Sequence, residues 1–285
     1  MKLTYIISFF VLFSFLSCKK ETVLIGDNNP PIVNNIPIVK IENYVNRVFI
    51  DLLGREPLDS ELEIETLALR EANLVKDARQ LLIKKLQSST DFVEGDTSYQ
   101  HAYHQHLYRL AKGRCLEGAS DADINDYIAG ATNEEYIDRL IQVKKSKSDL
   151  QTGSITIEEM FGRMINNAVY DDINMNTFNF VRASFDNLLW RFPTNFEFQA
   201  GFNMVDFETE ETLFGQTGNN REDYTEILIN SREMFEGMVI WAYRQLLARN
   251  PDTVETVGLL DDFYADKDFT KIQIAIMVTD EYAGF

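Results

Sequence analysis

One phrase occurs three times in the chain and constrains the fold more than any other feature. The copies share Val-x3-Phe/Tyr-x2-Leu-Leu-x-Arg-x-Pro and span residues 45–57, 181–193 and 239–251. In each copy the apolar positions fall at i, i+4, i+7 and i+8, which places them on one face of a helix. The proline disfavours helix at the residue before it, so each helix is expected to stop near the arginine. The sequence therefore predicts repeated helical units.

An arginine and a proline end every copy, and a capped second helix is expected to follow each proline. The arginine is expected to complement the negative end of the helix dipole. Thr194-x-x-Glu197 and Asp252-x-x-Glu255 are capping boxes, while Leu58 occupies the capping position of the first copy. Asp59 or Ser60 is expected to act as the cap there. The structural motif residues are Arg55, Pro57, Arg191, Pro193, Arg249 and Pro251.

A fourth, worn copy has Tyr99, Tyr103, Leu107 and Arg109 at the motif positions, with Ala111 in place of the proline. The larger step to the next copy indicates an insertion, which is expected to be a helix pair within residues 121–148. Strand signals are almost absent. These patterns predict an all-α fold, an irregular array of about four helical-hairpin repeats after a disordered N-terminal tether.

The expected organisation also includes two polar segments and a boundary between two helical regions. Lys147–Gly153 is expected to be a loop. Residues 206–223 are interpreted as a solvated insertion in preference to a functional loop. We expect an N-terminal helical repeat region at residues 41–150 and a C-terminal one at residues 151–285. Short acidic-aromatic segments, as in Ser231–Phe235 and Thr279–Tyr282, are interpreted as closing the units.

The first residues indicate export and lipid attachment. The run Leu3–Ser17 is apolar or hydroxylated and is shorter than the ~20 residues that span a bilayer, which is typical of a signal peptide (residues 1–17). Ser17-Cys18 resembles the lipobox of bacterial lipoproteins, although Phe15 departs from the usual pattern. Cys18 is therefore the predicted lipidation site, followed by a flexible tether at 18–40. An ordinary secretory signal with a chance cysteine is the alternative.

The sorting signals indicate where the protein is located, and its net charge indicates which partners are excluded. Lys20-Glu21 partly matches the export signal of surface lipoproteins, and no Asp follows Cys18. We expect attachment to the outer membrane, with the cell surface favoured over the periplasmic side. The net charge of −18 argues against nucleic acid as a partner. With Cys18 acylated, Cys115 is the remaining thiol, so no disulfide within the chain is expected.

Two known families resemble parts of the chain. Residues 47–57 followed by 79–89 resemble a domain of unknown function that accompanies cytochrome-type domains in large bacterial surface proteins. Residues 243–251, with the ending 279–282, are similar to helical repeats of secreted bacterial proteins related to phycobilisome linker domains. Together these resemblances cover most of residues 41–285. They imply a helical repeat and little about chemistry, and the chain has no Cys-x-x-Cys-His for heme attachment.

The three histidines cluster in the worn copy and raise the question of a metal site. A helix would place His101 and His104 on one face, where they are weak candidates for a shared ion. His106 takes the place of a core leucine. Asp121-Ala-Asp-Ile-Asn125 imitates a calcium loop but lacks the required glycine and glutamate, so Ser120-x-x-Asp123 is interpreted as a helix start. No cofactor is predicted.

A catalytic function is not favoured. Adjacent acids such as Asp171-Asp172, Glu210-Glu211 and Asp261-Asp262 point apart on a helix, and no nucleophile, phosphate-loop or zinc-protease motif occurs. Eight phenylalanines crowd the second repeat and are interpreted as core in preference to a ligand groove. They are Phe178, Phe180, Phe185, Phe192, Phe196, Phe198, Phe202 and Phe207.

These observations predict a lipid-anchored envelope lipoprotein that acts as a non-catalytic interaction or scaffold module. Its expected partners are the membrane, through the lipid, and a protein of the envelope. The alternative is a glycan- or metal-binding lipoprotein, with or without enzymatic activity, in the handling of envelope polysaccharide.

Overall fold

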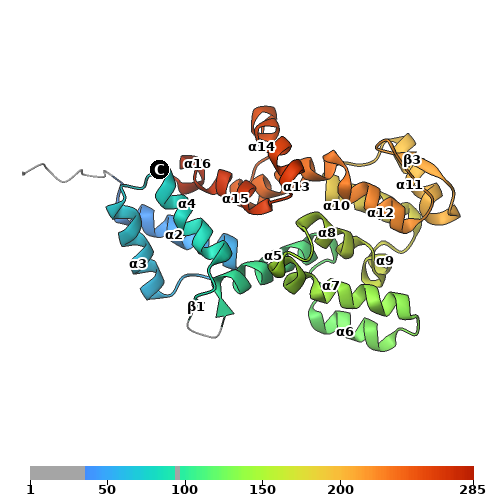
Figure 1. The fold of residues 1–285 in the computed structure, drawn as a ribbon, viewed down its shortest axis with the longest axis horizontal. Coiled ribbons are helices and arrows are strands. Elements are labelled where there is room, and N and C mark those ends of the chain that lie inside the picture. The colour runs from blue at the N-terminus through green and yellow to red at the C-terminus, as the bar shows by residue number, and fades with distance from the viewer. Residues whose placement is uncertain (1–35, 94–96) are drawn as a thin grey trace, which may run out of the picture. The chain divides into compact units, whose positions relative to one another are not determined.

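Fifteen helices, labelled α2 to α16, make up most of the part of the chain that the computed structural model describes, residues 36–93 and 97–285 (Figure 1). The predicted all-α fold is confirmed. The expected signal peptide, Cys18 and most of the expected tether lie outside the described residues.

The three clear copies form three helical hairpins. Their first helices end just before a residue in the left-handed conformation, namely Gly54 (φ 69°), Trp190 (φ 56°) and Ala248 (φ 54°). Two of these are not glycine, so the turn does not require it. The hairpins are α2 (Ile38–Leu53) with α3 (Asp59–Glu71), α10 (Thr177–Leu189) with α11 (Asn195–Phe207), and α13 (Arg232–Leu247) with α14 (Thr253–Asp266).

The repeated apolar stripe forms the core. In the first copy Val45, Phe49, Leu52 and Leu53 are at most 3% exposed. Full burial of such a side chain contributes about 1.5–3 kcal/mol. The first helix of each hairpin therefore provides much of the packing, while the second helix is more exposed.

The worn fourth copy keeps the apolar stripe without the turn. α4 (Lys76–Ser88) precedes α5 (Tyr99–Cys115), in which Tyr99, Tyr103 and Leu107 are buried. α5 continues through Ala111, because alanine retains the backbone N–H that proline would lack.

The expected helix pair is present as α6 (Asp121–Gly130) and α7 (Glu134–Thr152). The prediction of a loop at Lys147–Gly153 is wrong, because α7 continues to Thr152. Lys147 Nζ lies 3.2 Å from Asp121 Oδ2, and Arg163 Nη1 lies 2.7 Å from Asp149 Oδ2. These ion pairs hold the last two turns of α7, and Gly153, with φ 71°, ends the helix.

Two strand pairs lie outside the sequence prediction. β1 (Phe92–Val93) pairs with β2 (Thr97–Ser98), and β3 (Glu211–Leu213) pairs with β4 (Gln216–Gly218). The second pair occupies the predicted polar insertion. Its turn places Phe214 (φ 50°) and Gly215 (φ 76°) in the left-handed region. Phenylalanine is an unusual residue there, so the common Asn-Gly hairpin signal was absent from the sequence.

The first helices pack against the last ones, which lie beside them in blue and red (Figure 1). Arg47 Nη1 donates to Tyr282 O at 2.8 Å, and Arg79 Nη1 donates to Val278 O at 2.7 Å. Residues 36–285 form one compact unit. The remaining helices are α8 (Ile157–Ile165), α9 (Ala168–Asn174), α12 (Arg221–Asn230), α15 (Phe269–Met277) and α16 (Asp280–Ala283).

Candidate functional site

The repeated arginine forms the same ion pair in all three hairpins. Arg191 donates through Nη1 and Nη2 to the two oxygens of Glu197, at 2.9 and 2.6 Å. Glu197 Oε2 also accepts the backbone N–H of Thr194 at 2.7 Å, so one glutamate caps α11 and holds the arginine. Arg55 with Glu61 and Arg249 with Glu255 repeat this geometry.

The structure adds this ion pair to the role expected of the arginine at the helix dipole. Arg191 Nη1 also donates to the carbonyl of Phe192, which lies beyond the end of α10. The expectation that Asp59 or Ser60 caps α3 is wrong, because Leu58 is the capping residue and Glu61 accepts its N–H at 2.7 Å. The arginines and prolines of the motif therefore have a structural role.

Each ion pair extends to a later segment of the chain. Arg191 also binds Glu233 at 2.5 Å, and Arg249 binds Glu281 at 2.6 Å. These acids belong to the segments predicted to close the units, but Ser231 and Thr279 are the N-caps of α13 and α16. The acidic-aromatic segments therefore start helices and link one unit to the next. In the first unit the hydroxyl of Tyr99 donates to Glu61 at 2.8 Å.

The histidines lie along α5, where His104 and His106 are partly buried. His104 Nδ1 lies 2.7 Å from Gln100 O, and burial lowers the pKa of His104. Burial also lowers the pKa of His106 to about 4. A Cβ at Gly54 would lie 2.4 Å from His106 Nδ1, which explains glycine at this one turn. Within residues 36–93 and 97–285, no three His, Cys, Asp or Glu side chains gather as a metal site would require, and His101 is exposed.

The expectation that the crowded phenylalanines form core is correct for some of them and wrong for others, while Phe198 and Phe202 are partly buried. Phe180 and Phe185 are at most 3% exposed, whereas Phe178, Phe192 and Phe207 are 50–64% exposed. Phe196, on α11, is 71% exposed. The second repeat therefore presents aromatic rings to solvent from α10 and α11.

These rings form a connected strip that we call the aromatic face. Ring centroids are 5.0 Å apart for Phe178 and Phe198, 5.8 Å for Phe198 and Phe202, and 5.7 Å for Phe202 and Phe207. Arg182 lies 5.4 Å from the Phe178 ring and 5.0 Å from the Phe192 ring, in cation–π geometry. The aromatic face comprises Phe178, Arg182, Phe192, Phe198, Phe202 and Phe207.

The other repeats show that the fold does not require this face. At the position of Phe178 they carry Glu42 and Glu236, and at the position of Phe192 they carry Glu56 and Asn250. The three hairpins share their turns and ion pairs but not these rings. Comparing the exposed positions of the repeats was the signal that could have revealed the aromatic face.

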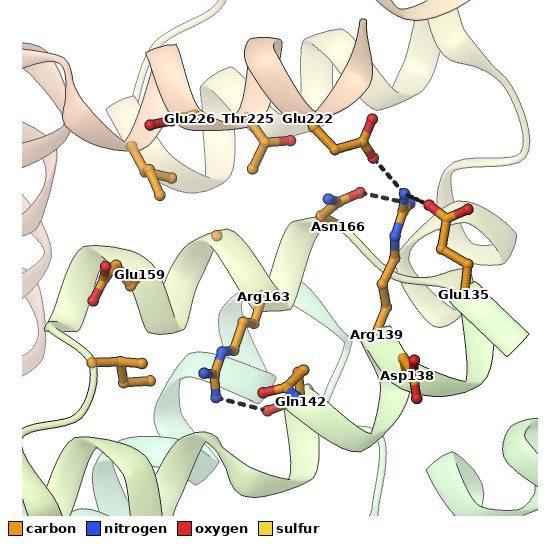
Figure 2. Close-up of a pocket in the computed structure, with 13 residues that line it drawn as sticks. Glu135, Asp138, Arg139, Gln142, Glu159, Arg163, Asn166, Glu222, Thr225 and Glu226 are labelled. Carbon is orange, nitrogen blue, oxygen red and sulfur yellow. Dashed lines mark hydrogen bonds and ion pairs between the residues drawn. The ribbon is translucent and has the colours of Figure 1, made fainter.

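A cleft with a volume of about 500 Å³ lies between α7, α8 and α12 (Figure 2). Ile155, Gly162, Thr225 and Ile229 supply its apolar lining. Gly162 lets α8 approach α12, because a Cβ there would meet Ile229 Cδ1 at 2.9 Å. We call this cleft the acidic cleft. No local sequence pattern predicts it, because it forms only where α7, from the inserted helix pair, comes to lie beside α8 and α12.

Carboxylates dominate the edge of the acidic cleft. The lining includes Glu135, Asp138, Glu159, Glu222 and Glu226 against two arginines. Arg139 on α7 binds Glu135 and Glu222, and donates to Asn166 Oδ1 at 3.1 Å (Figure 2). Arg163 binds Asp149 and the carbonyl of Gln142. Within the described residues, Asp138, Glu159 and Glu226 have no arginine partner.

Several of the other acidic candidates have structural partners. Asp121 begins α6 and lies 2.8 Å from Lys112 Nζ, and Ser120 with Asp123 forms the predicted capping box. Asp171 pairs with Arg221 at 2.6 Å, and Asp261 pairs with Arg232.

No protein-family model, curated protein or solved structure matches the sequence. Across the described residues, no helix combines the length and apolar character needed to cross a membrane. What the aromatic face can bind is therefore inferred from the residues that form it.

Proposed function

We propose that this chain is a lipid-anchored envelope lipoprotein that acts as a non-catalytic interaction module, docking a partner protein on the aromatic face. The observation that carries the proposal is the exposure of Phe178, Phe192 and Phe207. These three rings expose roughly 350 Å² at about 200 Å² per ring. The largest apolar patch on a typical monomer measures ~300–600 Å² and is often functional.

A protein segment fits this surface better than a glycan. Phenylalanine lacks the polar edge with which tyrosine and tryptophan hydrogen-bond to sugars. The hydrophobic gain from covering a phenylalanine ring requires an apolar partner. Aromatic residues and arginine are also the side chains most enriched at the centres of protein interfaces.

Charge indicates which protein segment would bind. Asp206, Glu208 and Glu210 lie next to Phe207 in the sequence and are exposed, and the whole chain carries −18. Two copies of so acidic a chain repel each other, which disfavours a second copy as the occupant. The proposed partner presents an apolar segment flanked by basic residues.

The anchor is the second part of the proposal and rests on the sequence. Acylated Cys18 would attach the chain to the outer membrane, with the cell-surface side favoured. The likeness of the units to domains of bacterial surface proteins and to linker-related secreted repeats supports a role in assembly at the envelope. Cys18→Ala should release the full-length chain from the membrane fraction and abolish lipid labelling. Retention of this variant in membranes would overturn the anchor.

A photo-crosslinking residue at Phe192 tests the docking surface in the full-length chain. The matched control places the same residue at Asn250, its equivalent in the third repeat. The expected result is one adduct at Phe192 and none at Asn250, with mass spectrometry placing the adduct on an apolar segment with basic flanks. Equal adducts at both positions would sink the proposal.

Phe178→Glu with Phe192→Glu should abolish the adduct from a crosslinker placed instead at Phe207. The first repeat already carries Glu42 and Glu56 at the matched positions, so the fold tolerates these residues. An adduct with twice the mass of the chain would indicate a second copy instead. Binding of purified envelope polysaccharide that this double variant loses would establish the glycan alternative.

A further inference from the structure

We infer that the protein segment docking on the aromatic face carries an acidic side chain, which pairs with Arg182 and has apolar residues on both sides. This inference rests on the proposed function and specifies the partner more closely. Arg182 is the charged member of the aromatic face, and its side chain is exposed.

Two phenylalanine rings hold Arg182 in place. Its Cζ lies 5.4 Å from the centre of the Phe178 ring and 5.0 Å from the centre of the Phe192 ring. Phe178 precedes Arg182 by one turn of α10, and Phe192 follows the end of that helix. The rings attract the guanidinium group and restrict its motion. An arginine fixed in this way loses little conformational entropy when it binds a carboxylate.

The chain places no acid of its own beside Arg182. Asp186 lies one turn later on α10, at a spacing that commonly pairs an arginine with an acid. Asp186 is engaged elsewhere, because its Oδ2 lies 3.3 Å from Arg114 Nη2 on α5. Within residues 36–93 and 97–285, no carboxylate lies within ion-pair distance of Arg182. Water therefore solvates this guanidinium group when no partner is bound.

A partner that covers the two rings also covers the cation. Because Arg182 lies within 5.4 Å of both ring centres, an apolar segment that contacts Phe178 and Phe192 displaces water from the guanidinium group. A charge that loses its water without gaining a partner strongly opposes binding. A carboxylate on the bound segment removes this cost, since it can accept two parallel N–H bonds from one guanidinium group.

The order of the residues along α10 places the acid inside the segment. Phe178 comes before Arg182 and Phe192 comes after it, so apolar contacts are available on both sides of the cation. A chain terminus at Arg182 would leave one of these rings uncovered. The acid is therefore assigned to a side chain within the apolar segment, and the basic flanks of the proposed partner lie further out.

Calorimetric titration of the full-length chain with two synthetic peptides tests the inference. Each peptide has two leucines on either side of a central residue, two lysines at each end and blocked termini. The central residue is glutamate in one peptide and glutamine in the other. The glutamate peptide should bind about tenfold more tightly or better, because a hydrogen-bonded charge pair forms with Arg182.

Unspecific attraction predicts the opposite order. The glutamine peptide carries one more net positive charge, so a chain of −18 should attract it more strongly at long range. Equal affinities, or tighter binding of the glutamine peptide, would overturn the inference. A third peptide that ends after its second leucine with a free carboxylate is expected to bind more weakly than the glutamate peptide. The reverse would replace the internal acid with a chain terminus.

Two variants assign the preference to Arg182. The first copy carries Asn46 at the matched position, so the fold tolerates Arg182→Asn. This variant should bind the two peptides without preferring glutamate. Arg70→Asn removes an exposed arginine from α3 and should keep the preference. Loss of the preference in both variants, or in neither, would refute the role of Arg182.

Phe178→Glu with Phe192→Glu distinguishes failure of this inference from failure of the proposed function. If the unchanged chain binds both peptides equally and the double variant binds neither, the docking surface stands and the acid is refuted. If neither peptide binds the unchanged chain, or the double variant binds as the unchanged chain does, the docking surface is refuted together with the inference.

Discussion

Arg191 and Glu197, six residues apart, are joined by two hydrogen bonds of 2.6 and 2.9 Å across the turn between α10 and α11. The same pairing in the other two hairpins explains why Arg-x-Pro-x3-Glu recurs. The motif joins the end of one helix to the start of the next.

Loss of this ion pair should destabilise the chain. Arg191→Met leaves Glu197, whose side chain is 15% exposed, without its cation. We expect the free energy of unfolding to fall by about 1–3 kcal/mol. Urea unfolding measures the change. Arg232→Met is the control, because its pair with Asp261 is 53% and 72% exposed and should contribute at most ~0.5 kcal/mol. Equal losses in both variants would contradict the role of the ion pair.

The same pair should make stability depend on pH. The hydrogen bonds from Arg191 lower the pKa of Glu197 to about 2 from an ordinary 4.5. A carboxylate with a lowered pKa in the folded state stabilises that state above pH 4.5, and the contribution is lost as the pH falls towards 2. Urea unfolding between these limits should show a smaller pH dependence for Glu197→Gln than for the unchanged chain. Identical slopes would refute the assignment.

An ion pair between buried Glu158 and partly exposed Lys267 joins α8 to the end of α14. Glu158 is fully buried, and Lys267 Nζ lies 2.6 Å from its Oε1. Neither oxygen of Glu158 has a hydrogen bond of regular geometry in the described residues, so charge holds the pair together. Lys267→Met should cost about 3 kcal/mol, because it leaves a buried carboxylate unpaired.

The double variant Lys267→Met with Glu158→Gln separates charge from packing. It should recover part of the loss, since the unpaired charge is gone. Urea unfolding of both single variants and the double variant completes the cycle. A double variant as unstable as the sum of the singles would show that the two side chains do not interact.

Gly237 sets the distance between α13 and α10. A Cβ there would lie 2.1 Å from Leu188 O, a backbone atom that cannot move aside. We expect Gly237→Ala to cost at least ~2 kcal/mol through forced separation of the helices. Gly258, within α14, has no atom within 4 Å of an added Cβ, so Gly258→Ala should stabilise by ~0.5–1 kcal/mol. Thermal unfolding distinguishes the two, and shifts of the same sign would contradict this account.

The sequence predicted the hairpins because their signals are local. Proline, capping box and apolar stripe act within a few residues of one another, so all three turns were placed within about two residues. The end of α7 was missed because ion pairs to Asp121 and Arg163 extend it. β3 and β4 were missed because Phe214 adopts a conformation that glycine usually takes. The end of α7 depends on tertiary contacts and the β3–β4 turn on an unusual backbone conformation, and neither can be recognised in a single sequence.

The candidate sites were predicted unevenly for the same reason. The phenylalanines were identified, but all eight were assigned to the core, although the repeat places Phe185 in the apolar stripe and Phe192 at a position that is Glu56 or Asn250 in the other copies. The acidic cleft was not predicted, since its lining residues on α7, α8 and α12 lie far apart in the chain and come together only when these helices pack. The lipidation of Cys18 stays a prediction.

Two of the repeated arginines bind acids that lie later in the chain, and these ion pairs limit how such a chain can change in length. Arg191 holds Glu233 at the start of the next unit, and Arg249 holds Glu281 near the end of the chain. An exchange of segments that keeps Arg191 with Glu233 and Arg249 with Glu281 leaves both arginines matched with their acids. A cut that separates Arg191 from Glu233, or Arg249 from Glu281, leaves a charged side chain without its partner. The ion pairs thus define the segments that recombination can exchange without loss of stability.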